Sequence, residues 1–332
     1  MITMLDVSLR AGVSKATVSR VLNGTGQVKE STRIAVFKAV EELGYRPNLL
    51  AQALANQTSN TIGLVVSNFD GPYFGRLLRQ AAHLIEASGK HMIVTDGHDT
   101  PEGEREAVHL LIDRRCDAII LYTRFMEEPA LMQLISQHHA LMVINRDLPQ
   151  ARDRCVFFEQ QQAASEVVKY LIKQGHRHIA CITAPINTPT AQSRLAGYKD
   201  ALEQNQITYH DSLVTLGDSS VAGGYHACCE LLARQQPFTA LFACNDDMAI
   251  GALRALHQAG KRVPEDVSLF GFDDEPSAEY LQPSLSTVYL PIDKMISTAI
   301  TQALRLSSGE IVEPVEPFVG ELKVRESVAK IK

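Results

Sequence analysis

Residues 5–24 read LDVSLRAGVSKATVSRVLNG, a pattern that predicts two short helices joined by a tight turn at Gly12. Glycine adopts the positive φ that a sharp helix-to-helix turn requires. Ser14 stands where its side chain would cap the second helix. A third helix over about residues 31–43, ending at Gly44, completes a predicted three-helix domain.

The apolar residues of these helices are expected to share one small core. Its predicted members are Leu5, Val7, Ala11, Val13, Val18, Val21 and Leu22, joined by Ile34, Phe37, Val40 and Leu43 of the third helix. The second helix keeps an outer face of small, polar and cationic groups, which suits the base edges and phosphates of a DNA major groove. That face is Lys15, Ala16, Thr17, Ser19 and Arg20. A helical hairpin that only caps a larger core is the alternative.

Charge is distributed unevenly along the 332 residues, although the composition is that of an ordinary globular protein, with 45% hydrophobic and 21% charged residues. Residues 1–60 hold seven Lys or Arg against four Asp or Glu, a net charge of +3. The whole chain carries -6, so the remainder carries -9. A basic module on an acidic body is the pattern expected where only the module meets nucleic acid.

From residue 61 onward, apolar runs of strand length alternate with helix-length amphipathic segments, which predicts an α/β fold with parallel sheets. The expected strands are 61–67, 91–95, 117–122, 141–144, 178–183, 239–244 and 267–272. A polar stretch near residues 146–162 divides them into two groups, so we expect two doubly wound lobes. Ligands of such sheets lie beyond the carboxyl ends of the strands.

Several classes of protein are disfavoured by what the sequence lacks. The six cysteines have no Cys-x-x-Cys spacing, and neither a signal peptide nor a membrane-length apolar window is evident, so we expect reduced thiols and a cytoplasmic protein. No catalytic or metal-binding motif is found, so no enzyme activity, cofactor or metal is expected. Paired carboxylates for glycoside hydrolysis could be imagined among Asp246, Asp247, Asp273 and Asp274, but they are better suited to reversible binding.

The string AGVSKATVSRVLNG followed by GYRPN resembles the signature of the LacI/GalR family of bacterial repressors. The resemblance extends along the chain through GHRHIACIT, RLAGYKDAL, CNDDMAIGALRALHQAG and VSLFGFDD, in that order. It implies an all-α helix-turn-helix domain plus a periplasmic-binding-protein-like core. Within the family the chain looks most like the galactose-type branch and the regulators of operons for β-glucosides such as cellobiose, arbutin and salicin.

The resemblance also implies which residues bind DNA. They are Ser14, Lys15, Ala16, Thr17, Ser19, Arg20, Asn23, Tyr45, Asn48 and Leu54, with Lys15 and Ala16 opening the recognition helix. Leu54 matches a leucine wedged into a central base step, for which ordinary helix packing is the alternative. Ser8 departs from the alanine common in the family, but it fits sterically.

Three domains are implied by the resemblance. They are a helix-turn-helix domain at 1–46, a hinge at 47–60, and a core at 61–332 that binds the effector and dimerises. Lobe 1 is expected at about 61–160 plus 291–320, and lobe 2 at about 161–290 plus 321–332.

Effector-binding residues are implied in both lobes. Arg194, Asn245 and Asp273 match cleft residues of the family and suit hydroxyl recognition. Alternatively, Asn245 caps a helix, and Asp273 with Asp274 forms a solvated turn. Further candidates near the family's contacts are Asn68, Phe69, Tyr73, Phe74, Glu159 and Gln162. Tyr73 is the expected aromatic platform, whereas Phe74 also suits core packing, and the placement of Glu159 and Gln162 is open by a residue or two.

The implied mechanism is a homodimer on a palindromic operator, released when a sugar-like inducer changes the lobes. A corepressor would use the same parts with opposite sign. Tetramers are not expected, because the chain ends at ESVAKIK without further leucine heptads. A solute-binding module of a sugar transporter is the rival, and it would need an export signal.

Overall fold

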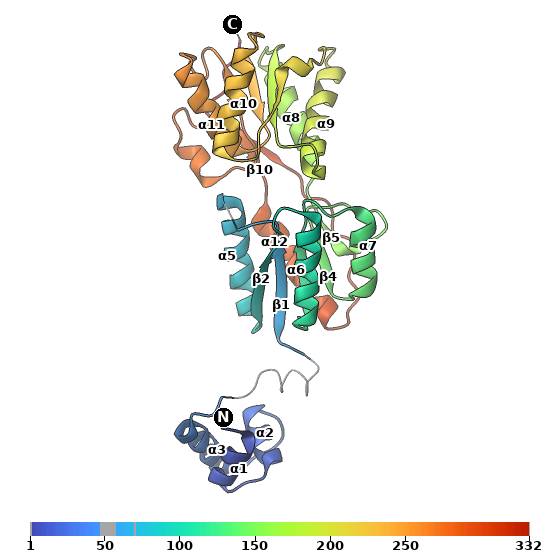
Figure 1. Cartoon of the computed structure of the whole chain (residues 1–332), viewed down its shortest axis with the longest axis vertical. Helices are drawn as coiled ribbons and strands as arrows, with labels where there is room; N and C mark the ends of the chain where they lie inside the picture. Colours follow the sequence, from blue (N-terminus) through green and yellow to red (C-terminus); the bar gives the residue numbers. More distant parts are fainter. Residues whose placement is uncertain (1, 47–57, 70, 332) are drawn as a thin grey trace. The chain divides into compact units, whose positions relative to one another are not determined.

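The computed structural model describes residues 2–46, 58–69 and 71–331. The chain forms two compact units, Met1–Ser59 and Asn60–Lys332 (Figure 1). The predicted hinge and its residues Asn48 and Leu54 lie outside the described ranges, apart from positions 58–60. No helix within those ranges is long and apolar enough to cross a membrane.

The first unit consists of α1 (Met4–Ala11), α2 (Lys15–Leu22) and α3 (Glu30–Leu43). Gly12 ends α1 with a φ of 66°, and the Ser14 hydroxyl accepts a hydrogen bond from the Thr17 amide at the start of α2. Gly44 ends α3 with a φ of 61°. The predicted turn, cap and third helix are therefore confirmed.

The core of the first unit differs from the predicted set. Val7, Val18 and Val21 are buried as expected, but Leu5, Ile34 and Phe37 are 48%, 61% and 49% exposed. In α3 the inward positions are Val36 and Ala39, with Val40 and Leu43 packed beside them. Residues three and four apart share one face of a helix, so the inward face is rotated away from Ile34 and Phe37. Their assignment to the core was wrong.

Lobe 1 of the second unit is a five-stranded sheet of parallel pairs in the order β2-β1-β3-β4-β5. Its strands are β1 (Thr61–Val66), β2 (His91–Asp96), β3 (Ala118–Tyr122), β4 (Leu141–Ile144) and β5 (Cys155–Val156). The helices of this lobe are α5 (Gly71–Ala87), α6 (Pro101–Asp113), α7 (Glu128–Gln137) and α12 (Ile292–Ser307). Phe74, Leu77, Ala81 and Ile85 of α5 are all buried, as expected of one of the amphipathic segments.

Lobe 2 is a four-stranded parallel sheet in the order β7-β6-β8-β9. Its strands are β6 (Ile179–Thr183), β7 (Val214–Leu216), β8 (Ala240–Ala243) and β9 (Ser268–Phe270). Its helices are α8 (Gln160–Lys173), α9 (Pro189–Gln204), α10 (Val221–Ala233) and α11 (Asp246–Gln258). In both lobes the sheet order places an early strand centrally, as in doubly wound sheets.

The chain passes between the lobes more than once. After lobe 2, it forms β10 (Thr287–Tyr289) and then α12, which packs against α5, β3 and β4 of lobe 1. It returns through β11 (Glu321–Lys323), which pairs antiparallel with β10. The C-terminal segment ends on lobe 2, where Ser327 donates a hydrogen bond to the Leu269 carbonyl at 2.6 Å.

Candidate functional site

A cavity of about 530 Å³ lies between the two lobes, where the loops after the strands converge. Six of the predicted effector residues line it: Asn68, Tyr73, Phe74, Arg194, Asn245 and Asp273. They come from the segment after β1, from α5, from α9, and from the segments after β8 and β9. This is the crevice at the carboxyl ends of the strands, where open α/β sheets bind ligands.

Arg194 and Asp273 form the buried centre of the cavity wall. The Arg194 Nη2 lies 3.0 Å from Asp273 Oδ1, and the two side chains are only 8% and 14% exposed. The guanidinium also donates to Gln160 Oε1 at 2.8 Å and to the Cys244 carbonyl, and it stacks 3.7 Å from the Phe272 ring centroid. Burial raises the pKa of Asp273, and Arg194 opposes that rise. These contacts fix the position of both side chains in the cavity wall.

Asn245 combines a structural role with its position at the cavity. Its Oδ1 accepts from the Met248 amide at 2.9 Å and caps α11, while its Nδ2 donates to the Ser219 carbonyl at 2.9 Å. The alternative of a helix cap is therefore confirmed for this residue.

The neighbouring acids Asp274 and Asp246 are tied into the structure. Asp274 pairs with Arg325 at 2.8 Å. Asp246 is 1% exposed and accepts from the Thr287 hydroxyl at 2.6 Å and the Glu275 amide at 2.8 Å. Neither lines the cavity, whereas Asp273 does, and its burial argues against a solvated turn.

The lobe 1 side of the cavity is aromatic. The rings of Tyr73, Phe74 and Tyr122 pack edge to face with centroids 5.2–5.9 Å apart, and the Tyr122 hydroxyl donates to that of Tyr73 at 3.2 Å. Phe74 is 5% exposed and belongs to the core, whereas Tyr73 is half-buried. Nearby, Asn68 donates to Asp99 at 2.9 Å, and Arg124 lies 3.8 Å from Asp99.

Three predicted effector residues do not line the cavity. Phe69 is 51% exposed, Gln162 is exposed, and the Glu159 amide bonds to the Phe318 carbonyl at the crossover between lobes. Gln160 is the residue of this segment that reaches Arg194. The preceding strand β5 has two residues, too few for an alternating pattern to fix the register of the segment after it.

Sequence reasoning missed the other charged residues of the cavity. These are Asp99, Arg124, Asp218, Asp247 and Glu275. Arg124 follows β3 by two residues, so the strand-end rule could have found it. Asp218 follows β7, whose three residues gave no strand signal, and Glu275 lies beyond the recognised pair of aspartates.

On the first unit, the predicted DNA-binding residues fall into two groups. Ser14, Lys15, Ala16, Arg20 and Asn23 are exposed, and Thr17 and Ser19 are half-buried. Tyr45 is 8% exposed and packs in the core of the three helices instead of lying on the outer face.

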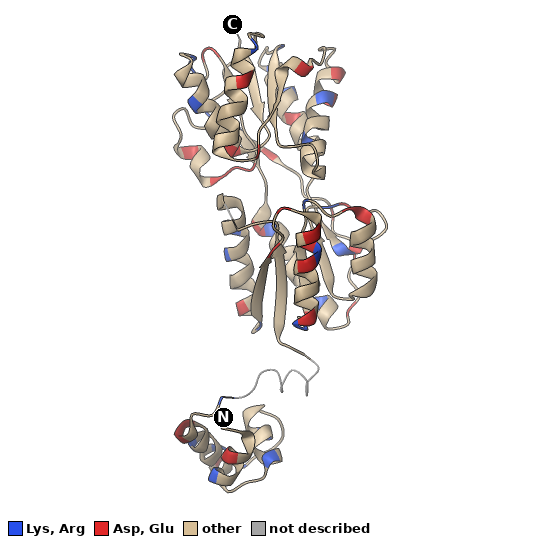
Figure 2. Ribbon diagram, viewed as in Figure 1, with Lys and Arg blue, Asp and Glu red and all other residues tan. Residues whose placement is uncertain are grey.

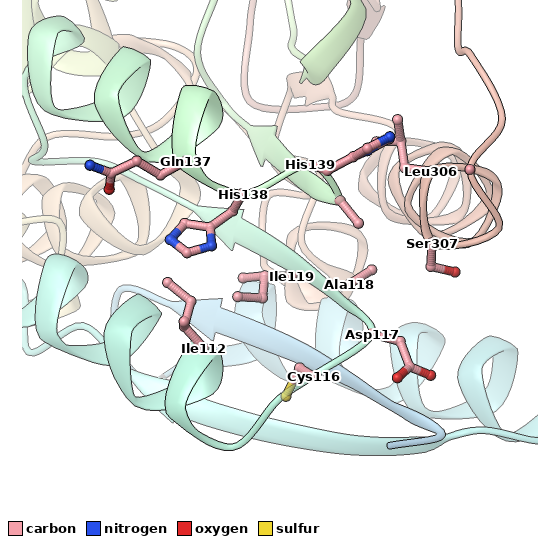
Figure 3. A pocket seen from close by; sticks show the side chains of 12 residues that line it. Ile112, Cys116, Asp117, Ala118, Ile119, Gln137, His138, His139, Leu306 and Ser307 are labelled. Carbon is pink, nitrogen blue, oxygen red and sulfur yellow. The ribbon is translucent and has the colours of Figure 1, made fainter. Parts of the chain in front are cut away.

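A second hollow, of about 400 Å³, lies at the amino ends of β3 and β4 in lobe 1. Figure 3 shows Ile112 and His138 on one side of it and Asp117 and Ser307 on the other. It contains no predicted site residue. Within the described ranges no group of three His, Cys, Asp or Glu side chains could hold a metal ion.

A three-helix head with an exposed second helix and a two-lobed α/β core with a polar interlobe cavity define a ligand-responsive DNA-binding regulator. The family described as "Bacterial regulatory proteins, lacI family" matches residues 3–48, and "Periplasmic binding protein-like domain" matches residues 168–328. The chain belongs to the LacI family of bacterial regulatory proteins. It is a transcription regulator with a helix-turn-helix segment and a ligand-binding core, which confirms the predicted fold class.

Individual relatives cover nearly the whole chain. The HTH-type transcriptional regulator AscG of Escherichia coli K12 is 44% identical over 99% of this chain and 98% of its own length. The lac repressor dimer bound to operator and the anti-inducer ONPF has a TM-score of 0.89 at 28% identity, covering 99% of each chain. A CelR–cellobiose complex has a TM-score of 0.73 at 31% identity, covering 98% of this chain and 100% of the other. The predicted likeness to the AscG type is confirmed.

Proposed function

We propose that this protein represses a sugar- or glycoside-utilisation operon and is released from DNA by a small sugar-like inducer. The cavity between the lobes carries this proposal, because Arg194 and Asp273 present a buried donor and acceptor pair suited to hydroxyl groups. A β-glucoside is the proposed inducer class, given the likeness to AscG and to a regulator solved with cellobiose.

The proposed DNA-binding surface is α2 with its N-terminal turn. The exposure of Lys15, Ala16 and Arg20 supports direct contact with base edges and phosphates. Ser14, Thr17, Ser19 and Asn23 complete the surface, and Tyr45 would act mainly by holding the core. Asn48 and Leu54 belong to the proposed hinge at 47–60, which links a head at 1–46 to the core at 61–332.

The proposed inducer site combines both lobes. Arg194, Asn245 and Asp273 would hold the ligand from lobe 2, while Asn68 and Tyr73 would hold it from lobe 1. Binding that favours one arrangement of the lobes shifts the population toward it and so changes operator affinity. No chemical step is part of this function, and the regulator would work in the cytoplasm, where its DNA lies.

The proposed assembly is a homodimer on a palindromic operator, since two-fold proteins read two half-sites. The likeness to the lac repressor dimer solved on its operator supports this assembly. A corepressor acting with the opposite sign would use the same parts.

Footprinting of the full chain on promoter DNA tests the proposal. We expect a protected palindrome, lost in Arg20→Ala and kept in the control Arg33→Ala, whose side chain is exposed on α3 and pairs with Glu30 of the same helix. Weaker protection should follow addition of an inducing glycoside. Absence of any protected palindrome would favour a solute-binding module, and an intact footprint with Arg20→Ala would remove α2 from the DNA-binding surface.

A further inference from the structure

Glu275 is a buried carboxylate beside the interlobe cavity. Its backbone is anchored on both sides, because its amide donates to Asp246 Oδ2 at 2.8 Å and its carbonyl accepts from Ala278 at 2.9 Å. The residue is 5% exposed and lines the cavity. Neither carboxylate oxygen has a hydrogen-bond partner among residues 2–46, 58–69 and 71–331.

This lack of partners sets Glu275 apart from the other buried acids. Glu104 accepts from Thr123 at 2.5 Å and from three successive backbone amides, and Asp246 accepts two hydrogen bonds. Native structures rarely leave a buried polar group unsatisfied, because the group loses its hydration without compensation. Where such a group borders a cavity, a ligand donor is the natural partner.

The surroundings of Glu275 disfavour the ionised form of its carboxyl group. Burial raises its pKa to about 7, and Asp273, Asp247 and Asp274 add to the rise. Arg76 of α5 opposes it, but that guanidinium already lies 3.2 Å from Asp293. A hydrogen-bond donor brought by a ligand would therefore be bound strongly at this point.

The charged residues of the cavity wall are mainly acidic. The acids that line it are Asp99, Asp218, Asp247, Asp273 and Glu275, against the cations Arg124 and Arg194. Both arginines are already paired with carboxylates, and Asp218 accepts from Ser220 at 2.6 Å. Glu275 and Asp247 have no ion pair within the part of the chain that the structure describes. Figure 2 shows acidic residues along the edge of lobe 2 that carries these loops.

We propose that Glu275 is a specificity-determining residue of the cavity, accepting hydrogen bonds from hydroxyl groups of an uncharged ligand and, with Asp247, excluding phosphorylated sugars. This inference rests on the proposed function, since it refines which glycosides the sensing site accepts. A phosphate in the cavity would face an excess of carboxylates, and like charges brought together exclude a ligand effectively.

The test compares neutral and phosphorylated probes on the full chain. Cellobiose, salicin and their 6-phosphates are titrated calorimetrically into the wild type, Glu275→Gln and the control Glu279→Gln, whose side chain is exposed in the same segment. We expect wild type and control to bind a neutral probe and reject its phosphate. Glu275→Gln should bind the neutral probe roughly ten- to a hundredfold more weakly, the usual loss for a charged hydrogen bond, and discriminate less against phosphate.

A second measurement needs no ligand. The carboxyl has a raised pKa in the folded protein, so it lowers stability as pH rises from about 4.5 through about 7. At pH 8, Glu275→Gln should therefore melt at least about 2 °C above wild type, with little difference at pH 5. The charged groups around it, Asp246, Asp247, Asp273, Asp274 and Arg76, are unchanged in the variant.

The outcomes separate this inference from the proposed function. Binding of a phosphorylated probe as tightly as its neutral form, or unchanged neutral binding by Glu275→Gln, overturns the inference while leaving a sugar-responsive regulator. If no probe binds the wild type, the β-glucoside class fails, and the melting comparison then decides. An equal melting temperature at pH 8 overturns the inference, and a higher one for the variant supports it.

Discussion

The interlobe cavity and the hollow at the other end of the lobe 1 sheet are similar in volume, at about 530 and 400 Å³, but they differ in chemistry. The cavity brings together charged side chains from both lobes. The hollow has one acid, Asp117, and Lys90 neutralises it at 2.7 Å. Only at the carboxyl ends of the strands do loops from both lobes converge, so volume alone does not identify a binding site.

Among variants that compare the cavity with the hollow, replacement of Arg194 should have the largest effect on stability. Arg194→Met leaves Asp273 buried without its cation, so we expect the free energy of unfolding to fall by about 3–5 kcal/mol in urea denaturation. The control is Arg262→Met, because Arg262 pairs with Asp266 at 2.7 Å but is 69% exposed. That variant should lose much less stability, because exposed ion pairs contribute little. Equal losses of stability in the two variants would mean that burial does not make the Arg194–Asp273 pair more stabilising than an exposed ion pair.

A smaller loss is expected at Glu104, which shapes the lobe 1 wall. Its carboxylate accepts from the amides of Arg124 and Met126 at 2.8 and 2.9 Å, and so fixes the loop that carries Arg124 into the cavity. Glu104→Gln places an amide group against those donors and should lower stability by about 2–3 kcal/mol and weaken ligand binding. The matched variant Glu106→Gln, exposed on the same helix, should change neither quantity. Unaltered ligand affinity in Glu104→Gln would show that the position of this loop does not affect ligand binding.

Asp117 tests whether the amino-end hollow takes part in sensing. Asp117→Asn weakens the pairing with Lys90, whose side chain is 20% exposed, and should lower stability by about 1.5 kcal/mol. Ligand affinity, measured by calorimetry, should stay at the wild-type value. A large change in affinity would show that the two ends of the sheet are coupled.

The smallest effect is expected from His138, at the wall of the hollow. Burial, with a lesser contribution from His109, lowers its pKa below the ordinary value of 6.5. The folded protein then binds this proton less well than the unfolded chain, so stability is lost as pH falls below about 6.5. Melting temperatures of His138→Gln should match wild type at pH 8 and drop less between pH 7 and pH 5. If the melting temperatures of His138→Gln and wild type changed equally with pH, the lowered pKa of His138 would be contradicted.

Sequence patterns predicted the regular parts of the fold well. Most of the recognised strands are runs of buried apolar residues, and Gly12 and Ser14 carry local signals for a turn and a cap. The strands β5, β7, β10 and β11 escaped notice, since two or three residues are too few for periodicity to appear.

The site was predicted in part. Asp273 follows a strand and lines the cavity as predicted, whereas Glu275 lines the cavity and Gln160 contacts Arg194 through tertiary packing that no local pattern encodes. The same limit explains the errors at Leu5 and Phe37, where the packing of three helices chose the buried face.

The central claim is that the interlobe cavity controls DNA binding, and operator affinity with and without inducer tests it most directly. For the wild type, an inducing glycoside should weaken operator binding by about 5- to 150-fold, the usual range for coupled sites. Asp273→Ala should bind the operator alone with near wild-type affinity and show no response to the glycoside. An equal response in wild type and Asp273→Ala would contradict the account.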